Sequence, residues 1–159
     1  MEDTLAKQFR TGHPPMSLDG FYKGTLLLLL QATPLQRVAR FLSAFAVPWK
    51  GKCFYHSKHV GDNILPLYMK FFLSLYPEKI TLGKSEFGGF HAFTFKTEKT
   101  KGVNGKEVLR LDYDIPENPQ RIRDVVDEIV EIGKKTYLGK AYLKENGSYR
   151  LVAYFKLQR

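Results

Sequence analysis

The second half of the chain is patterned as antiparallel strands joined by tight turns, and this pattern restricts the fold more than any other feature. Residues 148–157 alternate between an apolar face and a mixed face, the period of two that indicates a strand. Asn146-Gly147 precedes this run, and Asn104-Gly105 separates two earlier runs. Asn-Gly favours a type I′ hairpin turn, because both central residues of that turn need a positive φ. We therefore predict a meander of hairpin-linked strands.

Further segments complete the predicted sheet. Strands are predicted at residues 20–30, 50–56, 107–113, 128–132 and 137–144, and another begins near Phe87. Helices are predicted at residues 3–9, 33–47 and 67–75, with one helical turn at residues 120–125. Closing an antiparallel sheet removes its exposed edges. The predicted fold is therefore mostly β, an antiparallel barrel that is closed or strongly curved, with helices capping an end or covering a face.

The length and the aromatic content fit one domain with one core. The 159 residues are 43% hydrophobic and include 12 Phe and 9 Tyr, which suit the half-buried surface of a sheet. Gly12, Pro14 and Pro15 interrupt the chain after its first predicted helix. We expect residues 1–17 to form a leader that is partly disordered, and residues 18–159 to form a single β-barrel domain.

The cysteine content and the N-terminal sequence indicate in which cellular compartment the protein is expected. Cys53 is the only cysteine, so no disulfide can form within the chain. The N-terminus is acidic and lacks the basic-then-apolar order of a signal peptide. The longest aliphatic run covers residues 26–30, whereas a membrane-spanning helix needs about 20 apolar residues. We expect a soluble, cytoplasmic protein without a transmembrane segment.

The chain is basic, with 25 Lys and Arg against 16 Asp and Glu and a formal net charge of +9. A charge of this sign attracts nucleic acid, acidic lipid or an anionic ligand. The densest basic stretch, residues 96–106, is predicted to be a hairpin tip, and no RNA-binding aromatic motif or recognition helix accompanies it. We interpret the charge as a solvated surface and do not expect nucleic acid as the partner.

Two short motifs resemble a known family. Residues 20–24, Gly-Phe-Tyr-Lys-Gly, are similar to the Gly-x-Trp-x-Gly signature of a lipocalin-like, calycin-type family of unknown function, with Tyr22 in the Trp place. Residues 49–54, Trp-Lys-Gly-Lys-Cys-Phe, resemble the segment that follows in that family, and residues 11–14 resemble a third motif. The resemblance implies a calycin-type β-barrel and no established enzyme activity. It also implies that Tyr22 is structural and plugs the closed end.

Strand alternation predicts a set of residues that point into the barrel. An eight-stranded barrel is either filled by its own side chains or holds one small ligand, and the sequence leaves both open. Lys52 is a candidate for an anionic headgroup, whereas alternation places Arg110 outside. With Lys52, the candidate ligand-binding residues are Tyr22, Phe54, His56, His91, Phe93, Phe95, Tyr113, Tyr137 and Tyr149, and Leu26 and Leu28 are predicted to point inward with them.

A metal site, a haem site and a catalytic site have weaker support in the sequence. Cys53, His56 and His59 are ligand types that suit zinc or copper, but positions spaced by three do not share a strand face. We therefore predict no metal site, and a haem held by His56 or His91 has no better support. The sequence contains no Gly-x-Ser-x-Gly elbow and no phosphate-binding glycine loop. We assign no catalytic residue and no cofactor.

The leading hypothesis is a non-catalytic protein that holds a small hydrophobic or amphipathic molecule in a β-barrel pocket. An alternative is an enzyme, an isomerase or hydrolase, that uses His56 or His91 as a base in the same pocket. A second alternative is a basic interaction module for nucleic acid or other acidic partners, which would depend on Lys99, Lys101 and Lys106.

Overall fold

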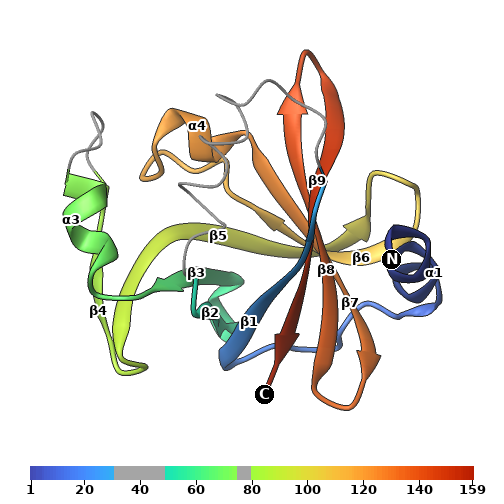
Figure 1. Cartoon of the computed structure of the whole chain (residues 1–159), viewed down its shortest axis with the longest axis horizontal. Helices are drawn as coiled ribbons and strands as arrows, with labels where there is room; N and C mark the ends of the chain where they lie inside the picture. Colours follow the sequence, from blue (N-terminus) through green and yellow to red (C-terminus); the bar gives the residue numbers. More distant parts are fainter. Residues whose placement is uncertain (31–48, 75–79) are drawn as a thin grey trace.

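The computed structural model describes residues 1–30, 49–74 and 80–159, and within these residues eight antiparallel strands close into a barrel (Figure 1). Each strand pairs with the next along the chain, and the last pairs with the first. The mostly-β, closed-barrel prediction is therefore confirmed. The barrel strands are β1 (Gly20–Leu29), β2 (Gly51–Tyr55), β3 (Val60–Leu65), β5 (Gly89–Lys101), β6 (Glu107–Asp112), β7 (Val125–Gly133), β8 (Thr136–Glu145) and β9 (Ser148–Gln158).

The remaining elements lie around this barrel. The short strand β4 (Gly83–Ser85) pairs with the start of β5, and α3 (Met69–Ser74) lies beside it in Figure 1. A 3-10 turn η1 (His56–Lys58) joins β2 to β3, and α4 (Gln120–Arg123) precedes β7. The helices predicted at residues 67–75 and 120–125 are confirmed with shorter bounds, whereas β3 and β4 were not predicted. The helix predicted at residues 33–47 lies outside the described residues.

The two Asn-Gly hairpins are both present, but they use different turns. Asn146 and Gly147 have φ values of 50° and 79°, as a type I′ turn requires. In the other turn Gly105 has a φ of 74°, and Asn104 does not have a positive φ. The Gly105 N–H donates to the Gly102 carbonyl at 2.9 Å, which indicates a type I turn followed by a left-handed glycine. The prediction of a type I′ turn at residues 104–105 is therefore wrong.

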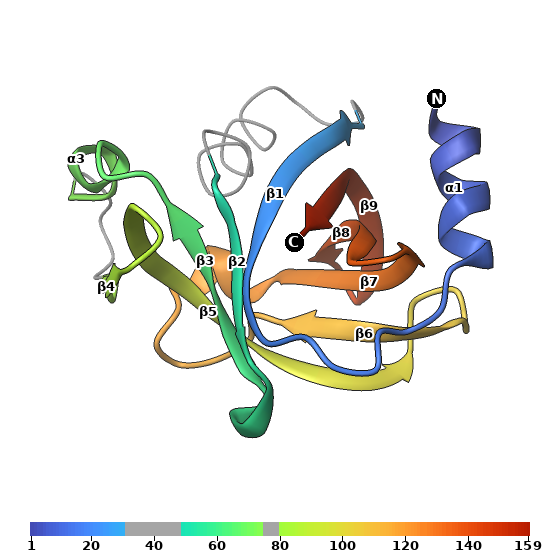
Figure 2. The same cartoon turned by 90° about the horizontal axis from the view of Figure 1, so that it is seen from below.

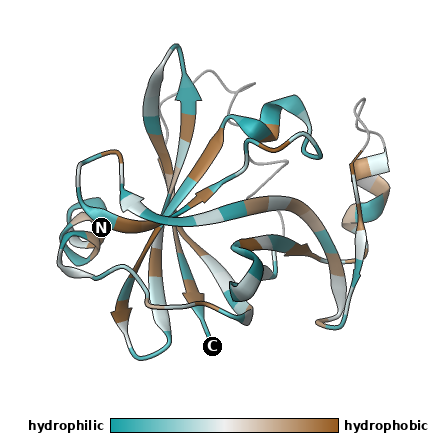
Figure 3. Cartoon of the chain, turned by 180° about the vertical axis from the view of Figure 1, so that it is seen from behind, coloured by the Kyte–Doolittle hydropathy of each residue, from teal (hydrophilic) through white to brown (hydrophobic). Residues whose placement is uncertain are grey.

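Aromatic rings fill the interior of the barrel. Tyr22 packs edge-on against Phe54 and Tyr137, and Phe54 packs in the same way against Phe95. Glycines admit some of these rings, because a Cβ at Gly139 would overlap the ring of Phe155. Hydrophobic and hydrophilic residues alternate along the strands (Figure 3), and each of the eight barrel strands contributes residues to one buried apolar cluster.

Of the four register shifts in the described strand pairings, three change which of the predicted side chains point inward. Extra residues interrupt the pairing of β1 between Leu26 and Leu28, of β5 near Phe93, and of β9 opposite residues 141–142. Each bulge shifts the alternation of its strand by one residue. Leu28, His91 and Tyr149, which were predicted to point inward, consequently lie on the outside of the barrel.

The helix α1 (Glu2–Thr11) packs against the outside of the barrel, in agreement with the helix predicted at residues 3–9. Leu5 and Phe9 are buried there against Val130, Leu138 and Tyr154, and further apolar contacts surround them. The chain then pairs with β7 through a bridge between residues 13 and 131 and crosses one end of the barrel to reach β1 (Figure 2). Among the described residues, no helix combines the length and the apolar character needed to cross a bilayer.

Candidate functional site

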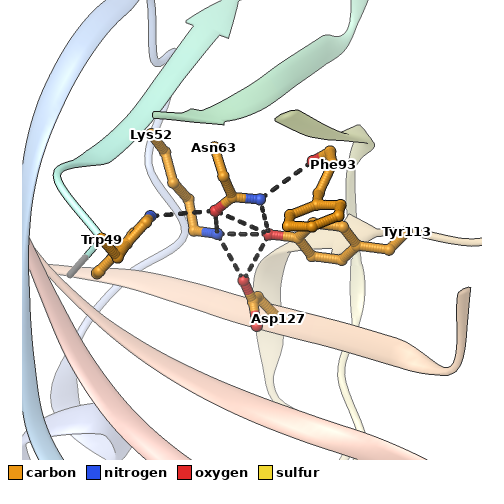
Figure 4. Close-up of polar contacts among 6 residues, drawn as sticks. All are labelled: Trp49, Lys52, Asn63, Phe93, Tyr113 and Asp127. Carbon is orange, nitrogen blue, oxygen red and sulfur yellow. Dashed lines mark hydrogen bonds and ion pairs between the residues drawn. The ribbon is translucent and has the colours of Figure 1, made fainter. Parts of the chain in front are cut away.

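Four polar side chains meet inside the barrel, and we name them the polar centre: Lys52, Asn63, Tyr113 and Asp127 (Figure 4). They come from β2, β3, the residue after β6, and β7. Lys52 and Asn63 are direct partners in the β2–β3 pairing, so strand register places them together. All four side chains are buried. Buried polar groups need hydrogen-bond partners, and these four supply many of them to one another, whereas Asp127 Oδ1 has no partner within the described residues.

Lys52 lies in the middle of this group. Its Nζ donates to Asn63 Oδ1 at 2.8 Å, to the Tyr113 hydroxyl at 2.5 Å and to Asp127 Oδ2 at 2.9 Å. An ammonium group has three N–H bonds, so these acceptors match its full donor capacity. The Tyr113 hydroxyl in turn donates to Asp127 Oδ2 at 3.1 Å.

Aromatic faces surround the same ammonium group. Nζ of Lys52 lies between 5.1 and 5.4 Å from the ring centroids of Trp49, Phe95, Tyr113 and Phe155. Ring faces attract a cation at such distances. Burial still lowers the pKa of Lys52, and the carboxylate of Asp127 opposes that shift. The pKa of Tyr113 is raised well above its usual value, mainly by burial and then by the Asp127 charge.

Asn63 connects the polar centre to the bulge in β5. Phe93 has a φ of 56°, an uncommon conformation for a bulky residue, and its carbonyl accepts a hydrogen bond from Asn63 Nδ2 at 3.1 Å. Asn63 Oδ1 also accepts from Trp49 Nε1 at 3.1 Å. The polar centre therefore holds three strands and a strained backbone position together. This arrangement indicates a structural role for Lys52 and Tyr113.

A pocket of about 440 Å³ lies at the end of the barrel that the segment 15–18 crosses, and we name it the end pocket. Phe54 lines it and also packs on Phe95, so the pocket lies directly over the aromatic core. Its other apolar walls are Pro15, Met16, Leu18, Val60 and Leu109. A hollow closed on one side by an N-terminal segment and on the other by core rings can hold an apolar group away from water.

The titratable side chains of the end pocket come from η1, the residue after it, and the end of β5. They are His56, His59, Glu98 and Lys99, and the hydroxyl groups of Ser17 and Thr97 line the pocket with them. The backbone N–H of His56 donates to the side chain of Asp19 at 3.1 Å, and His59 adopts a left-handed conformation with a φ of 53°. The two imidazole rings lie 6.1 Å apart, between centroids. These groups can orient the polar part of a bound molecule.

The structure separates the residues that the sequence grouped as ligand-binding. Phe54 and His56 line the end pocket. His91 and Tyr149 lie on the outer face, where His91 is 3.4 Å from Asp62 and Tyr149 accepts from Arg110 at 2.9 Å. The others lie in the core without lining that pocket: Tyr22, Lys52, Phe93, Phe95, Tyr113 and Tyr137.

Sequence reasoning missed several walls of the end pocket. The candidate residues did not include four that line the pocket and that come from four separate segments: Leu18, Val60, Thr97 and Leu109. In the β5–β6 pairing Leu109 lies opposite Lys99 and Thr97 lies opposite Leu111, a register that the type I′ turn predicted at residues 104–105 would have shifted by one residue. The approach of residues 15–18 to this end is a long-range contact that no local pattern signals.

Cys53 points away from the two histidines with which the sequence grouped it. It is buried on the outer face of β2, and burial is the main cause that raises the pKa of its thiol. His56 and His59 instead face the end pocket. The described residues contain no group of three or more histidine, cysteine, aspartate and glutamate side chains placed to hold a metal ion.

The closed, eight-stranded, antiparallel barrel fits a lipocalin-like or calycin-like fold. A solved structure described as a protein from Thermomonospora curvata superimposes on the whole chain and on 87% of its own, with a TM-score of 0.60. The two sequences are 15% identical, so this likeness concerns the fold alone. No model of a known protein family matches the chain, and no curated protein matches it either.

Proposed function

We propose that the protein binds a small hydrophobic or amphipathic molecule in the end pocket. The observation that supports this proposal is the pocket's volume of about 440 Å³ together with its apolar floor and polar rim. Pockets for small molecules commonly enclose about 300–1,000 Å³ and combine apolar walls with a few polar groups. Barrels of this strand number hold one small ligand in several known folds.

In the proposed complex the apolar part of the ligand packs on Phe54 and Leu18, and its polar end lies near His59 and Lys99. Burying apolar surface against these walls supplies most of the binding free energy, at about 25 cal/mol per Å² removed from water. The polar rim fixes the orientation of the ligand. Lys52 takes no part, because its ammonium group is held inside the polar centre.

The positions of the histidines narrow the enzyme alternative to His56, and the positions of the lysines argue against the basic interaction module. A reaction in the end pocket has His56 available, whereas His91 lies outside the barrel. The lysines of the β5–β6 hairpin do not form one free patch, because Lys106 donates to the Gly12 carbonyl at 2.6 Å and Lys99 lines the end pocket.

The experiment uses laurate as the probe, and the full-length protein with two matched variants. Thr97→Trp places a large ring in the end pocket, whereas Thr100→Trp places the same ring on the same strand outside it. Laurate binding is measured by isothermal titration calorimetry, and the near-ultraviolet circular dichroism of each variant reports its folding. We expect the native protein and Thr100→Trp to bind laurate, and Thr97→Trp to bind it at least about tenfold more weakly, a loss of about 1.4 kcal/mol.

Equal affinity of the two variants would place laurate elsewhere and overturn the assignment to the end pocket. Laurate, dodecylamine and dodecanol carry a negative, a positive and a neutral headgroup on the same aliphatic chain. If the folded native protein binds none of the three, the proposal is overturned for aliphatic ligands.

A further inference from the structure

A second hollow lies outside the barrel, between α1, the β5–β6 turn and the outer faces of β7 and β8. It encloses about 280 Å³, and we name it the α1 pocket. Its walls include Ala6 and Phe9 of α1, and its floor includes Glu128 and Lys140. It shares no lining residue with the end pocket, so a ligand here would be separate from the one proposed above.

Lys140 is the main unexplained group of the α1 pocket. Its side chain is only 7% exposed, and Nζ lies 4.5 Å from the ring centroid of Phe9. Within the described residues, no hydrogen-bond acceptor or acidic side chain contacts its ammonium group. Burial lowers the pKa of Lys140, the charge of Glu128 opposes that shift, and the charge of Arg10 adds to it. The ammonium group of Lys140 faces the α1 pocket without a protein acceptor in the described part of the chain, so an anion in the pocket could take the place of water beside it.

Glu128 lies next to Lys140 on the same floor. The two residues are direct partners in the β7–β8 pairing, yet no ion pair within 4.0 Å joins them in the described structure. Glu128 is 2% exposed, and its Oε1 accepts from the Val103 N–H at 2.5 Å. Since an ionised carboxylate has about four acceptor positions, Glu128 can also accept from a ligand. The Tyr142 hydroxyl is also buried and makes no hydrogen bond within the described residues. Burial raises the pKa of Tyr142, and Glu128 lies close enough for its carboxylate to raise that pKa further.

The other charged walls are mostly positive. Arg10 and Lys106 line the α1 pocket, and Lys106 donates to the Gly12 carbonyl at 2.6 Å, which holds its head at the edge. Arg110 is the β6 neighbour of Glu128, but its guanidinium group donates to the Tyr149 hydroxyl. The pocket therefore combines three lining cations with one carboxylate.

We propose that the α1 pocket binds a small oxyanion, a phosphate or a carboxylate, that also carries a hydroxyl group. The oxyanion binds Lys140, with Arg10 and Lys106 adding positive charge at the rim. The hydroxyl donates to the carboxylate of Glu128, which would repel an anion that has no proton to donate. Hydrogen phosphate meets this requirement, whereas sulfate at neutral pH does not. Lactate meets it as well, whereas acetate does not.

The experiment compares phosphate with sulfate and lactate with acetate by isothermal titration calorimetry, using the full chain at constant ionic strength. We expect the hydroxyl-bearing member of the preferred pair to bind at least about tenfold more tightly, because an unmet hydrogen bond to a buried charge costs about 1–3 kcal/mol. The stronger of phosphate and lactate identifies the oxyanion. Lys140→Met should abolish binding, whereas Lys144→Met, an exposed lysine on the same strand, should not change it.

Glu128→Gln separates this proposal from a general attraction of anions to a basic protein. Because the amide removes the negative charge, sulfate should then bind about as tightly as phosphate, and the native preference should disappear. The amide resonance of Val103 should shift when the native protein binds the ligand, because its N–H contacts Glu128. Unchanged binding in folded Lys140→Met, or equal binding of sulfate and phosphate together with equal binding of lactate and acetate, would overturn the proposal. So would failure of the folded native protein to bind phosphate and lactate at millimolar concentrations.

Discussion

Lys52 and Asp127 form an ion pair of 2.9 Å inside the barrel, and each side chain exposes only 1% of its surface. Removing two charges from water costs several kcal/mol for each ion, so attraction between them must be supported by further partners. Asn63 and Tyr113 provide that support through hydrogen bonds. The pair is therefore one unit with its neighbours, and removal of either charge should affect the whole group.

Replacement of Lys52 tests this dependence. Lys52→Met leaves the Asp127 carboxylate buried without its cation, and we expect the free energy of unfolding to fall by about 3–5 kcal/mol in urea denaturation. Adding Asp127→Leu should recover part of the loss, because an apolar pair replaces the lone charge. The exposed control Lys144→Met should change stability by less than about 0.5 kcal/mol. A Lys52→Met variant as stable as the native protein would contradict the role of the ion pair.

Replacement of Asn63 should lower the free energy of unfolding by more than the size of its side chain indicates. Asn63→Ala removes the donor to the Phe93 carbonyl and the acceptor for Trp49 and Lys52, so several buried groups lose a partner. We expect a loss of about 2–4 kcal/mol in the free energy of unfolding. Trp49→Phe removes one of these hydrogen bonds and should cost less. Equal losses in the two variants would show that the network around Asn63 contributes little.

Close packing of rings on glycines gives another prediction. A Cβ at Gly139 would overlap the ring of Phe155, so Gly139→Ala should lower the free energy of unfolding by about 1–3 kcal/mol. Phe155→Leu in the same chain should relieve the overlap, and a double-mutant cycle should show a favourable coupling of about 0.5–3 kcal/mol. Additive losses would mean that the ring moves aside without cost.

The raised pKa of Tyr137 predicts how the free energy of unfolding changes at alkaline pH. Burial is the main cause that raises its pKa from 10.0 to about 12. The unfolded chain releases this proton first, so the folded state binds more protons between these pH values and stability falls as pH rises. The contribution is fully present below pH 10.0. Tyr137→Phe should lose stability less steeply over this window in denaturant titrations at several pH values, and parallel slopes would contradict the assignment.

Local patterns were sufficient for most of the barrel. Alternation and the two Asn-Gly dipeptides identified the hairpins of the second half, because strand period and turn chemistry are properties of neighbouring residues. β3 was missed because Gly61, Asp62 and Asn63 are rare in strands. Asn63 is nevertheless buried there, because its amide satisfies a bulge in another strand.

The same reasoning did not always predict correctly which side chains of a strand point into the barrel. The bulge near Phe93 reverses the alternation before it, which places His91 outside while Phe93 and Phe95 remain in the core. No composition rule marks this bulge, since a phenylalanine and not a glycine occupies the left-handed position. The partners of Lys52 were also unpredictable, because they come from three separate segments of the chain.

The most direct test of the account is to map the binding of laurate by amide NMR on the full-length protein. We expect the largest shifts at Leu18, Val60 and Thr97, which line the end pocket from three separate segments. That result would show a ligand seated over Phe54 between the N-terminal segment and the strands. Shifts confined to Phe71 of α3 and Tyr68 just before it, which are both exposed, or no shifts at saturating laurate, would contradict the proposed function.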